Sequence, residues 1–258
     1  WVYENLKDLK KRYNEIKKAE DPANFIVLPA NDSHPVDILV ELTRLRQSTL
    51  TEMVGKELGL VLRNNAQGFI GGVTQDQALN INSRLGYFTP ALYLGVEFFK
   101  KLRDGSEGKI KIYNGKGRKV NKERLSSAYS DAVEQTGQFR GEWFNDRYSL
   151  DTRNLQVTYF KVNSKGKLVE VAEQLDQDTL MEDRLPGISL EDWIINPTSQ
   201  GLPKTSVNNG SLYFWAPVEG RVAWFYADAV WVALLCFRGP ALSDPAVGVR
   251  RAKIFQGK

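Results

Sequence analysis

The order of the sequence patterns along the chain is the feature that most limits its fold. Apolar residues at three- and four-residue steps dominate up to about residue 135, and short apolar stretches separated by turn residues follow towards the C-terminus. A doubly wound parallel sheet needs strands and helices in alternation, which this order does not supply. The sequence therefore predicts an α+β fold, and its 258 residues can build one large domain or two small ones.

The helical patterns predict an N-terminal helical region over residues 1–66, followed by the main domain over residues 67–258. The first helix is expected to end near residue 19, before Pro22. The later helices are expected from Ile38 past Leu45 towards Leu58, from the capping-box pair Thr74 and Gln77 to Gly86, from Thr89-Pro90 to about Gly105, and from Asn121 to about Gln135.

The remaining patterns are typical of short strands joined by turns. The expected strands are 109–113, 155–162, 167–171, 211–216, 221–226, 232–236 and 247–255, with turns at 114–117 and 163–166. The glycine-rich residues 68–72 favour a strand or a tight crossing over a helix. Ser189 is expected to cap one helical turn around Trp193, and residues 196–210 are rich in turn formers and predict a long loop.

The residues that most enzymes need are scarce. His34 is the only histidine and lies in a proline turn, so we expect a surface or capping residue and neither a catalytic base nor a metal site. Cys236 is the only cysteine, which excludes an internal disulfide. The turn at 114–117 lacks the spacing of a phosphate-binding loop. The carboxylates at 176–183 lack the frame of an EF-hand, so we expect a solvated loop there.

The charge balance points to no particular partner. The 35 Lys and Arg residues against 31 Asp and Glu residues give a net charge of +4, which is mostly mixed surface charge. The longest nearly uncharged run, residues 222–237, is shorter than the roughly 20 residues of a membrane-spanning helix, and Asp228 interrupts it. We therefore expect no membrane span. The chain begins with Trp1 and not with Met, so we expect a processed or trimmed form.

One window has an anomalous composition. Residues 220–248 contain no Asn, Lys, Glu, Gln or Met, although the other 229 residues hold 64 of them, a density that would place about eight in the window. Burial accounts for missing charges, and a central strand pair buried on both faces is one interpretation. Missing Asn fits burial less well, because Gly, Pro, Ser and Asp are present. The alternative is a surface with exposed aromatic residues, which is typical of interaction sites.

The stretches around this window form a recognisable frame. They are LPGISLEDW at 185–193, NPTSQGLP at 196–203, a Tyr/Trp strand, GRVA at 220–223 and a closing Gly248-Val249-Arg250. Over residues 89–255 the chain resembles the variable proteins of archaeal and archaeal-virus diversity-generating retroelements. Randomising both adenines of AAC codons excludes Lys, Glu, Gln and Met, as this window does. It also excludes Trp, so Trp224 and Trp231 depart from the pattern.

The resemblance implies a C-type lectin fold of the formylglycine-generating-enzyme-like subtype with an N-terminal helical extension. The lectin-like domain would span residues 67–258, with its variable region at about 220–250. The implied variable, ligand-binding positions are Tyr226, Asp228, Val230, Trp231, Ala233, Leu235, Phe237, Gly239, Leu242 and Asp244. The implied framework positions are Ala223, Phe225, Ala227, Cys236, Arg238, Ser243 and Gly248. Near-alternation of the two sets on a strand would let one face vary while the other anchors the fold.

The expected function is recognition of a macromolecular ligand, a protein or a cell-surface component, by a protein that is not an enzyme and carries no catalytic residues, metal or cofactor. Tyr226, Trp231 and Phe237 would be the anchors, and Asp228 and Asp244 the polar contacts. The few cations in the window argue against a nucleic-acid partner. The resemblance suggests a virion or a cell surface as the location. The alternatives are a glycan-binding lectin-like module and an enzyme of the formylglycine-generating type, whose chemistry is expected to need two cysteines.

Overall fold

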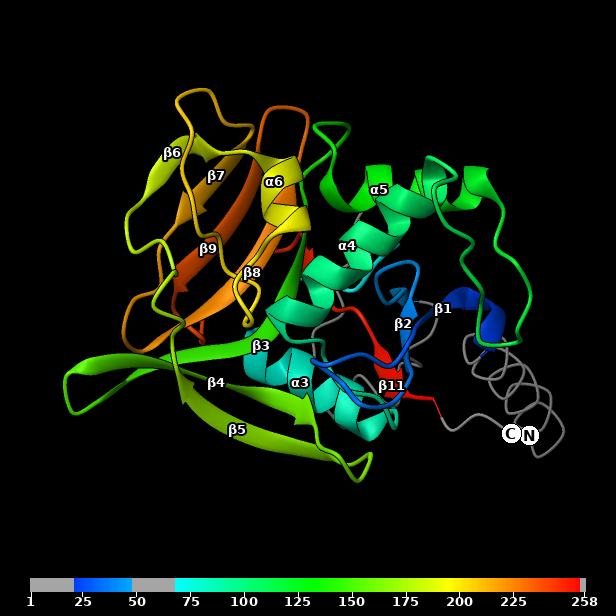
Figure 1. Cartoon of the computed structure of the whole chain (residues 1–258), viewed down its shortest axis with the longest axis horizontal. Helices are drawn as coiled ribbons and strands as arrows, with labels where there is room; N and C mark the ends of the chain where they lie inside the picture. The colour runs from blue at the N-terminus through cyan, green and yellow to red at the C-terminus, as the bar shows by residue number, and fades with distance from the viewer. Residues whose placement is uncertain (1–20, 48–67, 256–258) are drawn as a thin grey trace, which may run out of the picture.

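The computed structural model describes residues 21–47 and 68–255 and has a mixed α+β architecture dominated by strands (Figure 1). An eight-stranded sheet forms the body of the molecule, and a three-stranded sheet lies beside it. The α+β prediction is therefore confirmed. The predicted helix over residues 1–19, the pattern from Leu50 to Leu58 and the expected boundary between residues 66 and 67 lie outside the described residues.

The helices begin mostly where local capping signals place them. They are the 3-10 helix η1 (Pro22–Asn24), α3 (Gln75–Arg84), α4 (Leu92–Ser106), α5 (Lys122–Val133) and α6 (Leu190–Ile195). The Thr74–Gln77 capping box opens α3, and the side chains of Asn121 and Ser189 accept backbone N–H groups at the starts of α5 and α6. These three starts confirm the sequence predictions.

The start of α4 differs from its prediction. Thr89 does not cap this helix, because its hydroxyl accepts a hydrogen bond from the Asn82 side chain (2.9 Å), and the helix begins three residues later. The carboxylate of Asp146 takes over the capping role and accepts the N–H of Leu92 at 2.7 Å. A residue distant in sequence therefore satisfies a donor that helix starts usually satisfy locally.

The large sheet has the strand order β5-β4-β3-β8-β9-β7-β6, and β10 pairs with β3 off this path. Its strands are β3 (Arg140–Asp151), β4 (Asn154–Val162), β5 (Leu168–Gln174), β6 (Arg184–Ile188), β7 (Leu212–Trp215), β8 (Arg221–Ala227), β9 (Val232–Arg238) and β10 (Val247–Gly248). The strands β4, β5, β7, β8 and β9 follow their predictions. The long strand β3 was not predicted, because buried charged residues such as Glu142 interrupt its apolar pattern.

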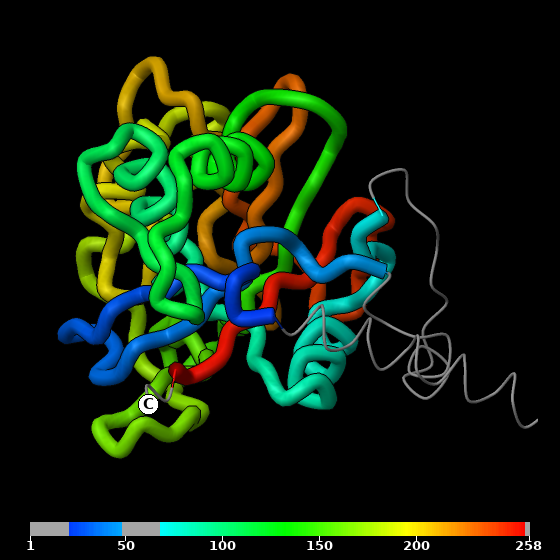
Figure 2. Tube along the Cα trace, turned by 90° about the vertical axis from the view of Figure 1, so that its right-hand side faces the viewer, coloured from blue at the N-terminus to red at the C-terminus, as the bar shows by residue number. Residues whose placement is uncertain are grey.

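The small sheet joins both ends of the described chain in the order β1-β2-β11 (Figure 2). Its strands are β1 (Phe25–Leu28), β2 (Ile38–Glu41) and β11 (Ala252–Ile254). The prediction of a helix from Ile38 is wrong: β2 is buried at all four residues, and a short apolar run does not distinguish a strand from a buried helix. The expected strand at 247–255 divides into β10 and β11. Residues 109–113 form only isolated bridges at their end, not a strand.

Helices α4 and α6 cover one face of the β8–β9 region of the large sheet (Figure 1). The Phe225 ring on β8 lies 5.1 Å from Phe99 of α4 and 5.8 Å from Trp193 of α6, measured between ring centroids. Burial of these large rings makes this face the main hydrophobic core. A second, smaller cluster of buried residues lies on the opposite face of the sheet.

Candidate ligand-binding surface

The β8–β9 hairpin lies in the centre of the large sheet and presents different residues to its two faces. The predicted framework residues Ala223, Phe225, Ala227 and Cys236 lie in the main core. The predicted variable residues Tyr226, Ala233 and Leu235 belong to the second cluster, and Phe237 packs against it. The strand periodicity inferred from the sequence thus separates the two sets as expected.

Three of the ten predicted positions are nevertheless buried. Tyr226, Ala233 and Leu235 are at most 6% exposed. Tyr226 pairs with Ala233 across the hairpin, and its ring stacks on Phe139 with centroids 4.6 Å apart. These side chains are therefore packed inside the second cluster. Tyr226, which we expected to be an anchor, does not provide free contact area for a ligand.

The exposed positions lie in the two loops that flank β9. Val230 is 67% exposed and Trp231 40% exposed in the β8–β9 turn, and Leu242 is 50% exposed in the loop after β9. Asp228, Phe237, Gly239 and Asp244 are partly buried. The structure thus brings seven of the ten predicted positions to or near one surface, in two loops and at the end of a strand.

The two aspartates in this set shape the loops. The Oδ1 atom of Asp228 accepts the N–H groups of Val230 and Trp231, both at 2.7 Å, and thereby closes the hairpin turn. Oδ1 of Asp244 accepts the N–H of Ala246 at 2.9 Å. Both residues form side-chain turns of the kind that Asp favours. Each carboxylate therefore has a structural role besides the polar ligand contact that we expected.

Aromatic side chains form a continuous track along this surface. Trp231 stacks on Tyr213 (4.8 Å, 14°), Tyr213 lies 6.4 Å from Trp215, and Trp215 lies 5.7 Å from Phe237, all between ring centroids. We call these four residues the aromatic track. Trp231 is exposed and the other three are partly buried. Such rings offer large contact areas at small entropic cost.

Tyr213 and Trp215 were not among the predicted site residues. They lie on β7, outside the compositional window, and pair with Ala233 and Leu235 of β9. The signal in the sequence was their alternation with the buried Leu212 and Phe214, which places Tyr213 and Trp215 on the other face of the strand.

A small pocket adjoins the end of the track. It has a volume of about 90 Å³, and its lining consists of Trp143, Trp224, Arg238, Leu242, Ser243 and Asp244. The Arg238 guanidinium lies 5.1 Å from the centroids of both the Trp224 and the Phe237 rings, which connects the pocket to the track. Two predicted variable residues, Leu242 and Asp244, are part of the lining.

The closing Gly248-Val249-Arg250 motif has a structural basis. A Cβ atom on Gly248 would lie 2.6 Å from the carbonyl oxygen of Ile70, and Val249 is fully buried. Arg250 forms a bidentate pair with Glu142 (2.6 and 3.1 Å) and donates to the carbonyl of Glu41 at 2.7 Å. The motif therefore anchors the end of the loop after β9 to the body of the domain.

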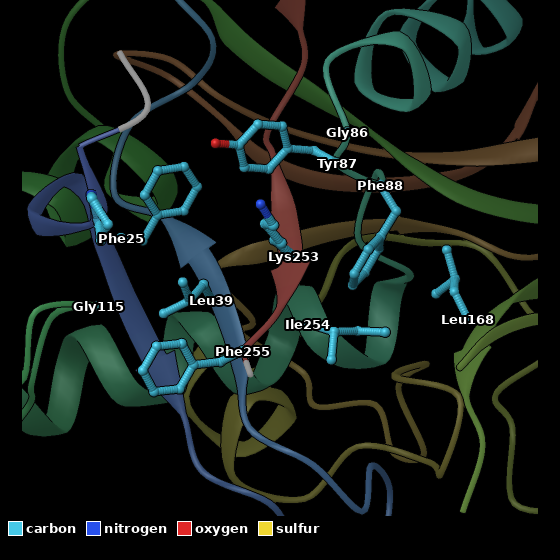
Figure 3. Close-up of a pocket in the computed structure, with 11 residues that line it drawn as sticks. Phe25, Leu39, Gly86, Tyr87, Phe88, Gly115, Leu168, Lys253, Ile254 and Phe255 are labelled. Carbon is cyan, nitrogen blue, oxygen red and sulfur yellow. The ribbon is translucent and has the colours of Figure 1, made fainter. Parts of the chain in front are cut away.

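A larger cavity lies away from this surface, next to the small sheet (Figure 3). It has a volume of about 570 Å³, and among its described lining residues only Tyr87 and Lys253 carry polar side-chain groups. Lys253 Nζ lies 5.5 Å from the Tyr87 ring centroid, and Tyr87 stacks on Phe25 at 5.6 Å. The lining is therefore mostly apolar, and its two polar side chains are in contact with each other.

The single cysteine and the single histidine are both buried and hydrogen-bonded. Cys236 is fully buried, accepts a hydrogen bond from Tyr148 Oη (3.3 Å), and has a pKa raised by burial. His34 is also fully buried; burial lowers its pKa, but hydrogen bonds to Glu97 (3.0 Å) and the Val36 carbonyl (2.9 Å) outweigh this and raise it. We expected a surface or capping residue, and the surface position is wrong, because the His34 ring is fully buried and hydrogen-bonded through both nitrogens.

The other motifs considered from the sequence are turns or links between loops. The main chain at 114–117 forms the predicted hairpin turn, with Gly117 N–H donating to the Asn114 carbonyl at 2.8 Å. In the acidic stretch, Asp176 accepts the Ser199 N–H and Asp183 accepts the Ala216 N–H. Within residues 21–47 and 68–255, no group of three or more His, Cys, Asp or Glu residues is placed to hold a metal ion.

No helix in the described ranges combines the length and the apolar character needed to cross a bilayer. Comparison of the chain with protein-family models, with curated proteins and with solved structures finds no match.

Proposed function

We propose that the protein recognises a macromolecular ligand, a protein or a cell-surface component, through the aromatic track and the exposed residues Val230 and Leu242 beside it. One observation carries the proposal: partly exposed rings lie in continuous contact across β7 and the β8–β9 hairpin, and the opposite face of these strands is fixed in the main core. Rings held in this way lose little entropy on binding, because the scaffold already restricts them. Shape and hydrophobic complementarity would supply most of the affinity.

We further propose that this surface is the variable region of a diversity-generating retroelement protein with a C-type lectin fold. The placement of the variable positions supports this. Val230, Trp231 and Leu242 are exposed in loops, and Gly239 has no left-handed backbone that would require glycine. A Cβ on Gly239 would meet only flexible side chains, the nearest atom being Nη1 of Arg221 at 3.2 Å. Side chains at these positions can change without altering the main core.

Sequencing of the gene neighbourhood tests the diversification. We expect a near-copy of the DNA that encodes residues 220–248, differing from it at adenines, beside a gene for a reverse transcriptase. Sequencing many copies of the gene from a natural population should place amino-acid differences at the exposed variable positions. A neighbourhood without such a copy, together with differences spread evenly over the chain, would refute this part of the proposal.

A binding selection tests recognition independently of genetics. A displayed library of random peptides is selected on the native protein, and the affinities of the selected peptides are then compared between the native protein and a Trp231→Ala/Phe237→Ala variant. Peptides that bind the native protein should lose at least about tenfold in affinity for the variant, because truncation of aromatic anchors costs more than about 1 kcal/mol each. A control variant, Tyr113→Ala, removes an exposed aromatic residue from a distant hairpin. Peptides that bind all three proteins equally would contradict the assignment of the surface.

A glycan-binding module is the second candidate, because aromatic faces such as those of Trp231 and Trp215 also pack against sugar rings. A glycan array probed with the native protein and the same two variants separates the two candidates. An enzyme of the formylglycine-generating type has less support. The buried Cys236, with its raised pKa, has the surroundings of a packing residue and not those of a thiolate nucleophile.

A further inference from the structure

We propose that the pocket beside the aromatic track binds a carboxylate group of the ligand. The inference rests on the proposed function and extends it by naming a chemical group that the surface recognises. The pocket has three walls: Trp143 of β3 and Trp224 of β8, Arg238 at the end of β9, and residues 242–244 of the following loop. Its volume of about 90 Å³ accommodates a few water molecules or one small planar group.

Two hydrogen-bond donors of the residues that line this pocket have no acceptor among the described residues. The indole N–H of Trp224 and the Nε–H of Arg238 are both buried, and neither finds a partner within residues 21–47 and 68–255. Trp224 is only 4% exposed, so water reaches its ring poorly. Trp143 lines the same pocket, but its indole N–H donates to the carbonyl of Val73 at 2.9 Å. Of the two tryptophans that line the pocket, only Trp224 therefore has an indole N–H without an acceptor among the described residues.

The chemistry of the two donors selects the ligand group. Unpaired buried donors are costly, and native proteins retain few of them. The Arg238 guanidinium is a cation and lies over the Trp224 and Phe237 rings. A group that accepts two hydrogen bonds and carries a negative charge satisfies both donors, and a carboxylate does so with charge-assisted bonds. A neutral carbonyl would satisfy the donors without balancing the charge.

The pocket also divides into constant and variable parts. Arg238 and Ser243 are framework positions by the resemblance, and Trp143 lies outside the compositional window. Leu242 and Asp244 are variable positions. A constant cationic site with a variable rim would bind an acidic group common to different ligands, while the rim adjusts the affinity. The present Asp244 repels a bound carboxylate, so its replacement by a neutral residue should strengthen binding.

A titration with acetate tests the pocket without knowledge of the ligand. The indole N–H signals of the full-length ¹⁵N-labelled protein are followed by NMR as sodium acetate replaces sodium chloride at constant ionic strength. We expect a saturable shift of the Trp224 signal. The signal of Trp193, which does not line the pocket and whose N–H donates to the carbonyl of Gly201, serves as the internal control. This signal also shows whether each variant remains folded.

Three variants test whether the acetate affinity changes in the expected direction. Arg238→Gln should weaken acetate binding at least about tenfold, because it removes a charge-assisted bond. Asp244→Asn should strengthen it. Trp224→Phe keeps a ring but removes the donor; in this variant the amide signal of Ser243 reports binding, which should be weaker than in the native protein. A Trp224 shift that chloride reproduces, or acetate affinity unchanged in both Arg238→Gln and Trp224→Phe, would overturn the proposal.

Two further probes separate the sources of a carboxylate. A blocked glutamate represents a protein ligand and glucuronate an acidic sugar, and the tighter of the two identifies the source. The acetate result is also distinct from the peptide selection described above. If acetate does not bind but peptides are still recognised, the carboxylate proposal fails and the proposed function stands. If acetate binds but no peptide is recognised, the pocket binds anions and the proposed peptide recognition fails.

Discussion

Asp146 illustrates how one buried residue connects distant parts of this chain. Its side chain is almost inaccessible to solvent and accepts the N–H of Leu92 at the start of α4. Burial raises the pKa of this carboxyl group to about 7, although the hydrogen bond from Leu92 opposes the shift. The folded protein therefore binds a proton at Asp146 at pH values where the unfolded chain has released it.

This shift predicts a dependence of stability on pH. Between about pH 4 and pH 7 the folded state holds more protons than the unfolded state, so the free energy of unfolding falls as the pH rises through this range. Asp146→Asn keeps an acceptor for Leu92 but removes the charge. We expect it to flatten the curve and to be more stable than the native protein at pH 8, by a free energy on the order of 4 kcal/mol or less.

Urea unfolding of the native and variant proteins at pH 4.5, 6 and 8 measures this difference. His34, whose pKa is also raised, lowers stability further as the pH rises from its ordinary value through the folded one, and it does so equally in both proteins. The contribution of Asp146 is therefore the difference between the two curves. Parallel curves would show that Asp146 does not titrate in this range.

Cys236 gives a second prediction at the level of a single residue. The thiol is fully buried and its pKa is raised by burial, so the reactive thiolate is scarce and inaccessible. In the native protein we expect no measurable labelling by iodoacetamide at pH 8 over an hour, and complete labelling in concentrated guanidinium. Rapid labelling of the folded protein would indicate that the core around Cys236 opens, and it would restore the case for thiol chemistry.

At the level of elements, local signals predicted the helix starts, whereas long-range contacts decided the rest. Thr74, Asn121 and Ser189 cap their helices through neighbours in the sequence, so their positions are readable. Strand β2 was misread because its burial depends on β1 and β11, which flank it on both sides. The two faces of the β8–β9 hairpin were predicted from alternation, but alternation does not reveal which side chains other segments cover.

Buried and exposed side chains of the hairpin and the following loop should differ in how much their truncation lowers the free energy of unfolding. Leu235→Ala removes a buried side chain and should lower the free energy of unfolding by about 2–5 kcal/mol. Val230→Ala and Leu242→Ala truncate exposed side chains and should each change it by about 0.5 kcal/mol or less. Urea denaturation of the three variants provides the comparison. Losses of similar size in all three would mean that the exposed loops are part of the core and are not free to vary.

At the level of the whole molecule, the two ends of the described chain are held together by buried ion pairs. Arg250 pairs with Glu142 of β3, and Arg251 pairs with Glu41 of β2 at 2.7 and 2.8 Å. The sequence showed the Gly-Val-Arg motif but not its partners, because Glu41 and Arg251 are 210 positions apart. Such pairings depend on the complete fold, so local sequence patterns do not reveal them.

The Glu142–Arg250 pair predicts a strong penalty for removing one partner. Glu142→Gln leaves the Arg250 charge buried without its counter-ion and should destabilise the protein by about 3–5 kcal/mol, and Arg250→Met should do the same to Glu142. The double variant should lose clearly less than the sum of the two, because neither charge is then left alone. Glu107→Gln in the exposed pair with Lys109 serves as the control and should change stability by less than about 1 kcal/mol. If the single losses simply add in the double variant, Glu142 and Arg250 stabilise the domain separately, and the ion pair between them is not what holds Arg250 in place.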